Sequence, residues 1–401
     1  MIYLDNNATT AIAPEVFEAM RPYLTAKYWN PSSMYDPALN LARQIDGVRE
    51  SIARYLGAVS AREILFTSCA TESNNTAVFG VIQANPRRRH LVTTRVEHPA
   101  ILEVCKELEH RGYEISWLDV DKDGNLNLAQ YVQAIRPNET LMVSVMHANN
   151  ETGVIFPIER LARIAKETDP GIIFHTDATQ SMTKLPIDMS GNFQNVDLLS
   201  CSGHKFHAPK GIGLLYIRQG TPIRTFLIGG HQENGRRGGT ENVPYIFGIA
   251  RALELAAETH EEDFARIERL RNKLEAGIVE KVPFIEVNGK GAERMPNTLN
   301  IACHSVEGES ILMMMNERGI CVSSGSACTS GSLDPSHVLT AMKVPSSAIQ
   351  GSIRFSLSRY STEADIDYVI EVFPEIIDQI RQASPFWDKK NHCPLQRSLM
   401  M

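Results

Sequence analysis

The chain has 401 residues, of which 43% are hydrophobic and 22% are charged, a composition that is typical of globular proteins and excludes wholesale disorder. A chain of this length is expected to form about two or three domains. Its net charge of −7 argues against nucleic acid as a partner, which needs a basic surface. The N-terminus lacks the basic and apolar regions of a targeting segment, and the apolar runs are too short to cross a bilayer, so we expect a soluble cytoplasmic protein without membrane contact.

Short apolar runs alternate with amphipathic stretches along the first two-thirds of the chain. Runs of this length that are rich in β-branched residues and separated by helices predict a mostly parallel sheet with helices on both faces. In such a sheet, functional residues collect on the loops that follow the carboxyl ends of the strands. The pattern predicts strands over 63–67, 91–94, 141–146, 172–176, 196–201 and 211–218, and helices over 71–83, 99–111 and 157–166.

The last third of the chain predicts a smaller α+β unit. Apolar residues at helical spacing favour one helix over 243–257 and another over 261–281, which would connect the two domains. A final helix is expected to start near Thr362 and to kink or break at Pro374, and the polar chain after Ser384 is expected to fray. The remaining predicted elements are strands over 284–287, 298–301 and 352–357 and a helix over 308–317.

The cysteines do not form a recognisable framework. There are seven, they are scattered, and no pair has the C-x-x-C spacing, so neither a disulfide framework nor a closed zinc site is expected. Cys328 differs from the rest because Gly and Ser surround it in 323–331, a composition typical of an exposed loop. A thiol there is a candidate for reaction. Five others lie in or beside apolar runs and are expected to be small core residues, namely Cys69, Cys105, Cys201, Cys303 and Cys321.

Polar side chains follow several predicted strands at the point where each strand ends. Small residues before Thr71 lead into a helix N-terminus, where free backbone N–H groups favour a phosphate, although a plain helix cap is an alternative. His98 follows the second strand, where ring stacking, proton transfer, capping and core packing all stay open. Asn150 lies in a polar run after the third strand. Two further groups follow the next strands, Asp177 with Gln180 and Ser202 with His204 and Lys205.

One ligand meets the needs of these groups together. A lysine amine reacts near neutral pH when it is desolvated or has charged neighbours, and a buried aspartate needs a cationic partner. Pyridoxal phosphate offers an aldehyde for Lys205, a pyridinium nitrogen for Asp177, a phosphate for the small donors and a ring face for a histidine. Neither a Gly-rich dinucleotide fingerprint nor a P-loop is present in the sequence to compete with this hypothesis.

These motifs also occur together, in this order, in a known family. With Ser-Gly-His-Lys at 202–205 followed by Ser-Ser-Gly-Ser-Ala-Cys-Thr-Ser-Gly at 323–331, the chain resembles the cysteine desulfurases, class-V pyridoxal-phosphate enzymes of fold type I. The resemblance covers residues 3–383, and the phrases at 207–211, 229–233 and 384–387 look most like the nitrogen-fixation branch. The other segments that carry it are 5–10, 70–74, 97–100, 149–153, 175–178 and 237–240.

The resemblance implies a fold as well as a family. This is an α/β fold of pyridoxal-phosphate fold type I, with a mostly parallel seven-stranded sheet in the large domain and a smaller α+β domain. The large, cofactor-binding domain would span 15–259. The small domain would combine 1–14 with 260–385 and carry the Cys328 segment, and 386–401 would form a flexible tail.

The resemblance also implies how the cofactor would be held. Lys205 would bind its aldehyde as a Schiff base, and Asp177 would pair with the pyridinium nitrogen so that the ring acts as an electron sink. Gln180 would form a hydrogen bond with the ring hydroxyl, and His98 would stack on the ring and assist Lys205 in proton transfer. The other implied contacts come from Ala70, Thr71, Asn150, Ser202 and His204, with Thr240 reaching in from the second subunit of a homodimer.

For the reaction, the resemblance implies that L-cysteine is converted to L-alanine and that Cys328 takes the sulfur as a persulfide. Asn150 and Arg354 would orient the substrate, with Arg354 gripping its carboxylate, although an outward-facing structural role on a strand is an alternative for Arg354. The sulfur would pass to an iron–sulfur scaffold or another acceptor protein, with nitrogenase as the expected context. The Cys328 persulfide would also contact the metal of the cluster transiently.

Three alternatives stay open at this point. A selenocysteine lyase or a cysteine-sulfinate-type enzyme can share the scaffold. A class-V aminotransferase would not need Cys328, and a non-catalytic cluster-assembly protein would not need Lys205, Asp177 and His98. The sequence also departs from the family pattern at Trp29, where glycine is usual, and over 34–37. These departures leave the chemistry intact and bear on the shape of the substrate entrance.

Overall fold

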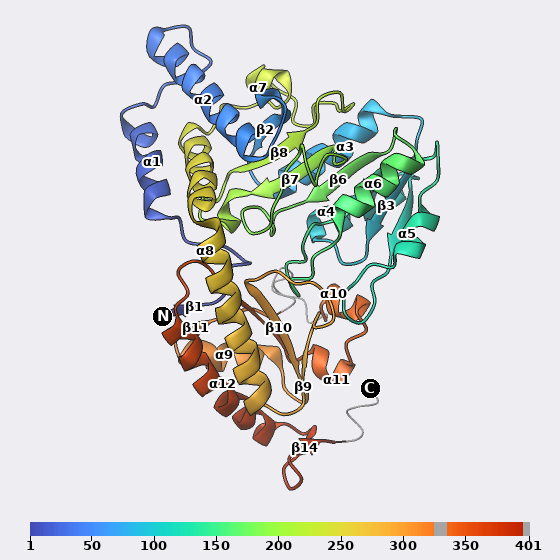
Figure 1. Cartoon of the computed structure of the whole chain (residues 1–401), viewed down its shortest axis with the longest axis vertical. Coiled ribbons are helices and arrows are strands. Elements are labelled where there is room, and N and C mark those ends of the chain that lie inside the picture. The colour runs from blue at the N-terminus through green and yellow to red at the C-terminus, as the bar shows by residue number, and fades with distance from the viewer. Residues whose placement is uncertain (325–334, 396–401) are drawn as a thin grey trace.

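The computed structural model describes residues 1–324 and 335–395 of the chain (Figure 1). Its larger unit is built on the strands β2 (Ile64–Thr67), β3 (His90–Thr94), β4 (Glu114–Leu118), β5 (Thr140–Ser144), β6 (Ile173–Asp177), β7 (Leu198–Ser202) and β8 (Gly213–Ile217). They form one seven-stranded sheet in the order β2-β8-β7-β6-β5-β3-β4. β8 is antiparallel to both neighbours and the other neighbouring strands run parallel, which confirms the predicted α/β fold with a mostly parallel sheet.

Helices cover both faces of this sheet (Figure 1). Alternate side chains of a strand point to opposite faces, so residues that are neighbours in sequence join different cores. On β6, Ile173 packs with residues of α3 (Ala70–Ala84) and α4 (Pro99–His110), whereas Phe174 packs in the cluster that includes α6 (Ile158–Thr168). The other helices of the larger unit are α1 (Pro14–Thr25), α2 (Asp36–Tyr55), α5 (Leu128–Ala134) and α7 (Gln232–Gly235), with 3-10 turns at Ala61–Glu63 and Gly203–Lys205.

A smaller unit contains the antiparallel strands β9 (Ile285–Val287), β10 (Thr298–Cys303) and β12 (Ser352–Ser356), with β10 in the middle. Its apolar core, which runs from Leu4 to Ile377, is separate from the two cores of the large sheet. On this basis we propose the domain division at residue 259. The remaining elements are β1 (Ile2–Tyr3), its parallel partner β11 (Ile320–Cys321), α9 (Gly308–Glu317), α10 (His337–Ala341), α11 (Ser346–Ile349) and α12 (Glu363–Ala383).

One continuous helix, α8 (Val243–Lys281), joins the two units, where the sequence pattern predicts two helices (Figure 1). The intervening residues 258–260 contain neither proline nor glycine, so nothing in them interrupts the helical hydrogen bonds. α12 likewise continues past Pro374, because Phe373 and Ile377 hold it against the core on both sides, and the expected break is absent. No described helix has the length and apolar character needed to span a membrane.

The chain after α12 forms a hairpin over part of the segment expected to be a flexible tail. β13 (Trp387–Asp388) pairs with β14 (Cys393–Pro394), and Trp387 is buried. The Arg381 guanidinium lies 4.3 Å from the centre of the Trp387 ring, and Phe284 packs edge-on against the same ring. This aromatic anchor explains why a segment of polar composition has a defined structure as far as residue 395.

A buried ion pair connects α2 with α7. The Arg49 Nη1 and Nη2 atoms donate to the two carboxylate oxygens of Glu233 at 2.7 and 3.0 Å, and the Phe66 N–H donates to one of them. The two side chains are 7% and 3% exposed. Removing one partner of such a pair leaves the other charge uncompensated in the interior.

We expect Glu233→Ala to lower the free energy of unfolding by about 3 kcal/mol, because the Arg49 charge then stays buried without its partner. The matched control is Glu114→Ala, which removes an ion pair with Arg136 whose side chains are largely exposed and should cost far less. Urea unfolding followed by circular dichroism measures both losses. Equal losses for the two variants would contradict the stabilising role of the buried pair.

Candidate active site

A cavity of about 890 Å³ lies where the carboxyl ends of the central strands meet the smaller unit. Asp177 ends β6, Ser202 ends β7 and Lys205 ends the 3-10 turn that follows, which brings all three to the same edge of the sheet. Within the described part of the chain, Thr240 is the predicted site residue that does not line this cavity. Those that do are Ala70, Thr71, His98, Asn150, Asp177, Gln180, Ser202, His204, Lys205 and Arg354.

Lys205 is held by the N-terminal segment of the chain. Its Nζ donates to the backbone carbonyls of Asn7 and Ala8, each at 2.7 Å. Asn7 is buried, and its Nδ2 donates to the Thr298 hydroxyl of β10 at 2.9 Å, which fixes this segment between the two units. Sequence reasoning assigns no role to Asn7 or Ala8, and the signal that points to them is the family motif at 5–10.

Asp177 is a buried carboxylate with neutral hydrogen-bond donors around it. The Asn74 side-chain amide donates to Oδ2 at 2.7 Å, and the Thr179 N–H donates to Oδ1 at 2.9 Å. A carboxylate fixed in this way inside a cavity suits a cationic ligand group such as a pyridinium nitrogen. Sequence reasoning misses Asn74, because its contact with Asp177 depends on how α3 packs over β6.

Among the buried polar atoms of the cavity residues that have no hydrogen-bond partner in the described part of the chain are Ser202 Oγ and Gln180 Oε1. Buried polar atoms are nearly always paired, so these two indicate that the cavity takes a ligand. Ala70 and Thr71 line the cavity from the first turn of α3, where backbone N–H groups favour a phosphate. Gln180 Nε2 donates to the Asn7 carbonyl at 3.0 Å, which fixes that side chain in the wall. These residues fit a phosphate and a polar ring.

His98 caps α4 from the wall of the cavity. The Ala100 N–H donates to its Nδ1 at 3.1 Å, so the neutral ring carries its proton on Nε2. Burial lowers the pKa of His98, and the negative charge of Asp177 acts in the opposite direction. His204 lies within hydrogen-bond distance of Thr9, and burial together with the positive charge of Lys205 lowers the pKa of His204 to about 4. Both rings are therefore neutral at physiological pH.

Arg354 reaches the cavity from β12 of the smaller unit, where it is 2% exposed. Its Nη1 donates to the Asn150 carbonyl at 2.9 Å, and its Nη2 forms an ion pair with Asp5 at 2.8 Å. The Arg354 Nε is buried and has no partner among the described residues. The guanidinium is thus held rigidly in the part of the cavity wall that the smaller unit contributes.

Cys328 lies outside the described residues, and with it the predicted sulfur and transient metal contacts, but the chain is described on both sides of it. Before it, Ser323 and Arg354 exchange backbone hydrogen bonds of 3.2 and 2.6 Å. After it, the Ser336 hydroxyl donates to the buried Glu151 carboxylate at 2.5 Å, and the following helix packs Leu339 into the core of the larger unit. Both flanks are therefore tied to residues at or next to the cavity.

Three further predictions concern residues around this site. Thr240 is exposed and lines a separate cavity together with Glu233 and Arg237. Trp29 is half-buried against the core of the larger unit, and no residue of 29–37 lines the candidate site of this chain. Cys69 was expected in the core but lines the candidate site, because it lies at the N-cap position of α3, next to Ala70 and Thr71.

Comparisons with known proteins decide which chemistry this arrangement serves. A family model described as Aminotransferase class-V matches residues 2–369. A cysteine desulfurase of Trichormus azollae is 52% identical over 386 residues, which cover 96% of this chain and 95% of the relative. The chain belongs to the cysteine desulfurases.

Two more relatives agree with this membership. The cysteine desulfurase NifS of Azotobacter vinelandii is 49% identical and covers 96% of this chain and 95% of its own length. A solved structure of a NifS-like protein has a TM-score of 0.88 at 38% identity, covering 94% of this chain and 99% of the other. The predicted family is confirmed, and its cofactor is pyridoxal 5′-phosphate, which the unpaired polar atoms and the buried carboxylate of the cavity fit.

Proposed function

We propose that this protein is a cysteine desulfurase that converts L-cysteine to L-alanine and holds the released sulfur as a persulfide on Cys328. The observation that carries the proposal is one cavity lined by Lys205, Asp177 and Arg354, with the flanks of the Cys328 segment tied to its edge. A class-V aminotransferase would use the same cavity without a thiol. Sulfur transfer adds the need for a nucleophilic cysteine that reaches the substrate.

Different residues of the cavity would contact different parts of the cofactor. Pyridoxal phosphate, when bound, withdraws electrons from the substrate and so weakens its Cα–H and Cβ–S bonds. Lys205 would hold the aldehyde end, Asp177 would keep the ring nitrogen protonated, and Gln180 would form a hydrogen bond with the ring hydroxyl. The residues that hold the phosphate and the ring face are Ala70, Thr71, His98, Ser202 and His204.

Lys205, assisted by His98, transfers the proton at the substrate Cα. The two carbonyls that accept from the Lys205 Nζ keep the amine in place between proton transfers. His98 offers Nε2, because its Nδ1 is occupied by the Ala100 N–H. The low pKa that burial gives His98 keeps the ring uncharged beside the cationic cofactor.

Arg354 and Asn150 orient the substrate. The Arg354 guanidinium faces the cavity from a strand that cannot move without disturbing the β10 pairing, so it offers a preorganised charge for a carboxylate. Asn150 lines the same cavity, and its carbonyl helps to hold that guanidinium. A zwitterionic amino acid is therefore bound by its carboxylate, with its side chain free to meet the thiol.

We expect Arg354→Lys to raise the KM for L-cysteine by about 100-fold, because a point charge replaces a planar fork that contacts both the carboxylate and the Asn150 carbonyl. Steady-state kinetics of alanine formation measures the change, and kcat should fall by much less. Arg318→Lys, on the exposed end of α9, is the matched control and should leave both constants unchanged. A KM within twofold of the wild-type value for Arg354→Lys would remove this residue from the substrate site.

Cys328 completes the reaction. Its thiolate forms an S–S bond with the substrate sulfur while the Cβ–S bond of the substrate breaks. The electron pair of the broken bond stays with the carbon skeleton, which takes up a proton and leaves as alanine. The flanking contacts at Ser323 and Ser336 give this segment two fixed ends beside the cavity.

A homodimer would complete the cofactor site. Thr240 is exposed in the chain and does not line its own cavity, as expected for a residue that serves a second subunit. Several large apolar side chains of the larger unit are also exposed, and an interface with a second subunit would cover such side chains. These side chains are Phe17, Leu24, Tyr28, Met34, Tyr35 and Ile228.

The sulfur carried by Cys328 suits an iron–sulfur scaffold or another acceptor protein in the cytoplasm, with transient metal contact at the persulfide. The six cysteines of the described part are free thiols, which fits a reducing compartment. The nitrogenase context is supported by the NifS relative at 49% identity. Pull-down of scaffold proteins after loading with L-cysteine would identify the acceptor.

The assay that tests this function supplies L-cysteine with a reductant and measures alanine and sulfide together. We expect the two products in equal amounts, because each turnover splits one Cβ–S bond. L-Selenocysteine in a parallel assay distinguishes a selenocysteine lyase, for which it would be the better substrate by kcat/KM. With pyruvate as the amino-group acceptor, an aminotransferase would instead convert L-cysteine to 3-mercaptopyruvate, and alanine would form from the pyruvate without sulfide.

A further inference from the structure

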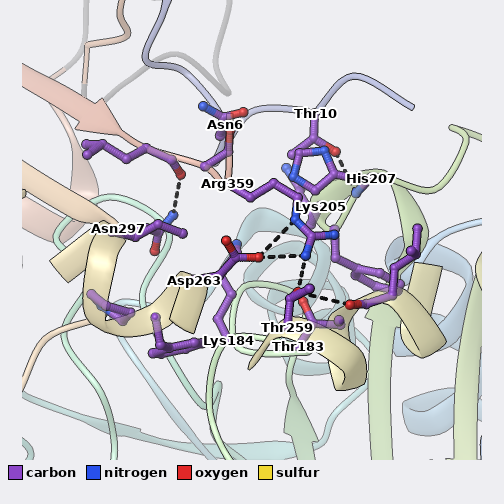
Figure 2. A pocket seen from close by; sticks show the side chains of 18 of the residues that line it. Asn6, Thr10, Thr183, Lys184, Lys205, His207, Thr259, Asp263, Asn297 and Arg359 are labelled. Atoms are coloured by element: carbon purple, nitrogen blue, oxygen red, sulfur yellow. Dashed lines mark hydrogen bonds and ion pairs between the residues drawn. The ribbon is translucent and has the colours of Figure 1, made fainter. Parts of the chain in front are cut away.

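A second cavity, of about 660 Å³, adjoins the cofactor site at the junction of the two units with α8 (Figure 2). Lys205 lines both cavities, so they share that side chain as a wall. α8 contributes an apolar wall that includes Leu255 and Ile267, and Lys184 enters from the loop that follows β6. The role proposed above for the site residues does not use this cavity.

Lys184 has no anionic partner among the described residues, so its charged form is uncompensated in this cavity. Its Nζ is shielded from solvent and has no hydrogen-bond partner among residues 1–324 and 335–395. Burial lowers the pKa of Lys184 to about 7, and the positive charges of Lys205 and Arg354 act in the same direction. Buried ammonium groups are normally paired, so a lysine left in this state indicates a partner that is not part of the described protein.

The other charges around the cavity leave it with an excess of positive charge. Asp263 is engaged by Arg359, whose Nε and Nη2 donate to one carboxylate oxygen at 3.0 and 2.6 Å (Figure 2). Arg266 lies 3.5 Å from the other oxygen. The negative charge of Asp263 is therefore already paired with Arg359 and Arg266 and does not compensate Lys184.

The backbone before Lys184 is also held in an unfavourable conformation. Thr183 has a φ of 68°, in the left-handed region that a β-branched residue rarely adopts. Such strain persists where the surrounding structure requires it, commonly at ligand sites. Strain at Thr183 and the uncompensated Lys184 charge thus occur side by side in the chain and both face one cavity.

We propose that this cavity binds a small monovalent anion, such as a halide or formate, against the Lys184 ammonium. A single negative charge matches the single uncompensated cation, and a dianion would exceed it. Because Lys205 lines both cavities, a bound anion would also stabilise positive charge on the Lys205 amine. The site is separate from the substrate carboxylate site at Arg354, which does not line this cavity.

Anion binding should be coupled to protonation of Lys184, so the affinity should rise as the pH falls from about 8 to about 6. The histidines nearest to Lys184 carry lowered pKa values and stay neutral over this range. The charged and titratable groups that face Lys184 are Lys205, His204, His207, Arg354, Arg359 and Asp263.

Thermal unfolding of the holoenzyme in sodium chloride, against sodium gluconate at the same ionic strength, tests the proposal. Gluconate is a large, strongly hydrated anion that loses much more hydration than chloride on reaching a buried ammonium, so we expect a Tm about 2 °C higher in chloride. Lys184→Met should remove this chloride increment and should itself be at least as stable as the wild type in gluconate, because it removes a buried charge. Lys210→Met, which removes an exposed charge nearby, should keep the increment.

A bromide-soaked crystal tests the site without any variant. We expect an anomalous peak within hydrogen-bond distance of the Lys184 Nζ. The proposal is overturned if this peak is absent, if chloride and gluconate give the same Tm, or if Lys184→Met keeps the full chloride increment. Each of these readouts is independent of desulfurase activity, so the anion site and the proposed function can fail separately.

Discussion

Replacing Lys205 with alanine is expected to abolish the visible absorbance of the covalently held cofactor and to lower alanine formation from L-cysteine by more than about 1,000-fold. The reason is that one amine has two tasks here. It holds the cofactor in the cavity, and it moves the proton at the substrate Cα. The hydrogen bonds from the Lys205 Nζ to the Asn7 and Ala8 carbonyls show that the backbone is arranged around this amine.

Absorbance spectra of the purified variant and a fixed-time alanine assay measure the two effects. Lys210→Ala, five residues further along and exposed, is the matched control and should keep the colour and the rate of the wild type. A coloured Lys205→Ala protein with more than about a tenth of the wild-type rate would show that another residue holds the cofactor.

The second large effect is expected for Asp177→Asn, which keeps the shape of the side chain and removes its charge. The Asn74 amide donates to Asp177 Oδ2, so the new amide places a donor against a donor, and the ring nitrogen loses its anionic partner. We expect kcat to fall by about 100-fold and the cofactor to be lost more readily on dialysis.

Steady-state kinetics and the cofactor content after dialysis give the two readouts. Asp119→Asn, which alters an exposed pair with Arg95, controls for the loss of one negative charge from the protein. An Asp177→Asn variant with the wild-type kcat would contradict the assignment of this carboxylate to the ring nitrogen.

The central strands are predictable from the sequence because each is buried on both faces and therefore reads as a short apolar run, as in β5 and β6. β4 was missed because it is an edge strand whose Glu114–Leu118 run is half-exposed and resembles a loop. The sequence pattern predicts two helices where the structure has the single helix α8. The reason is that charged residues weaken the apolar pattern where this helix passes between the two units.

Some residues of the candidate site are likewise recognisable from the sequence and others are not. Asp177, Ser202 and Lys205 are recognisable from the sequence because each follows a strand at the edge where ligands bind. Asn74 and Asn7 lie in the family motifs at 70–74 and 5–10, but their roles are not recognisable, because they act through contacts between segments that are distant in the sequence. The roles of all the site residues stay predictions until the variants are measured.

The central claim is that Cys328, rather than any other thiol, receives the sulfur. Cys69 is the structural rival, because it lines the cofactor cavity. Peptide mass spectrometry of the holoenzyme after L-cysteine, without reductant, measures where the persulfide forms. The account predicts an increase of about 32 Da on the peptide that contains Cys328 and none on the Cys69 peptide. Persulfide on Cys69, or turnover that leaves Cys328 unmodified, would contradict it.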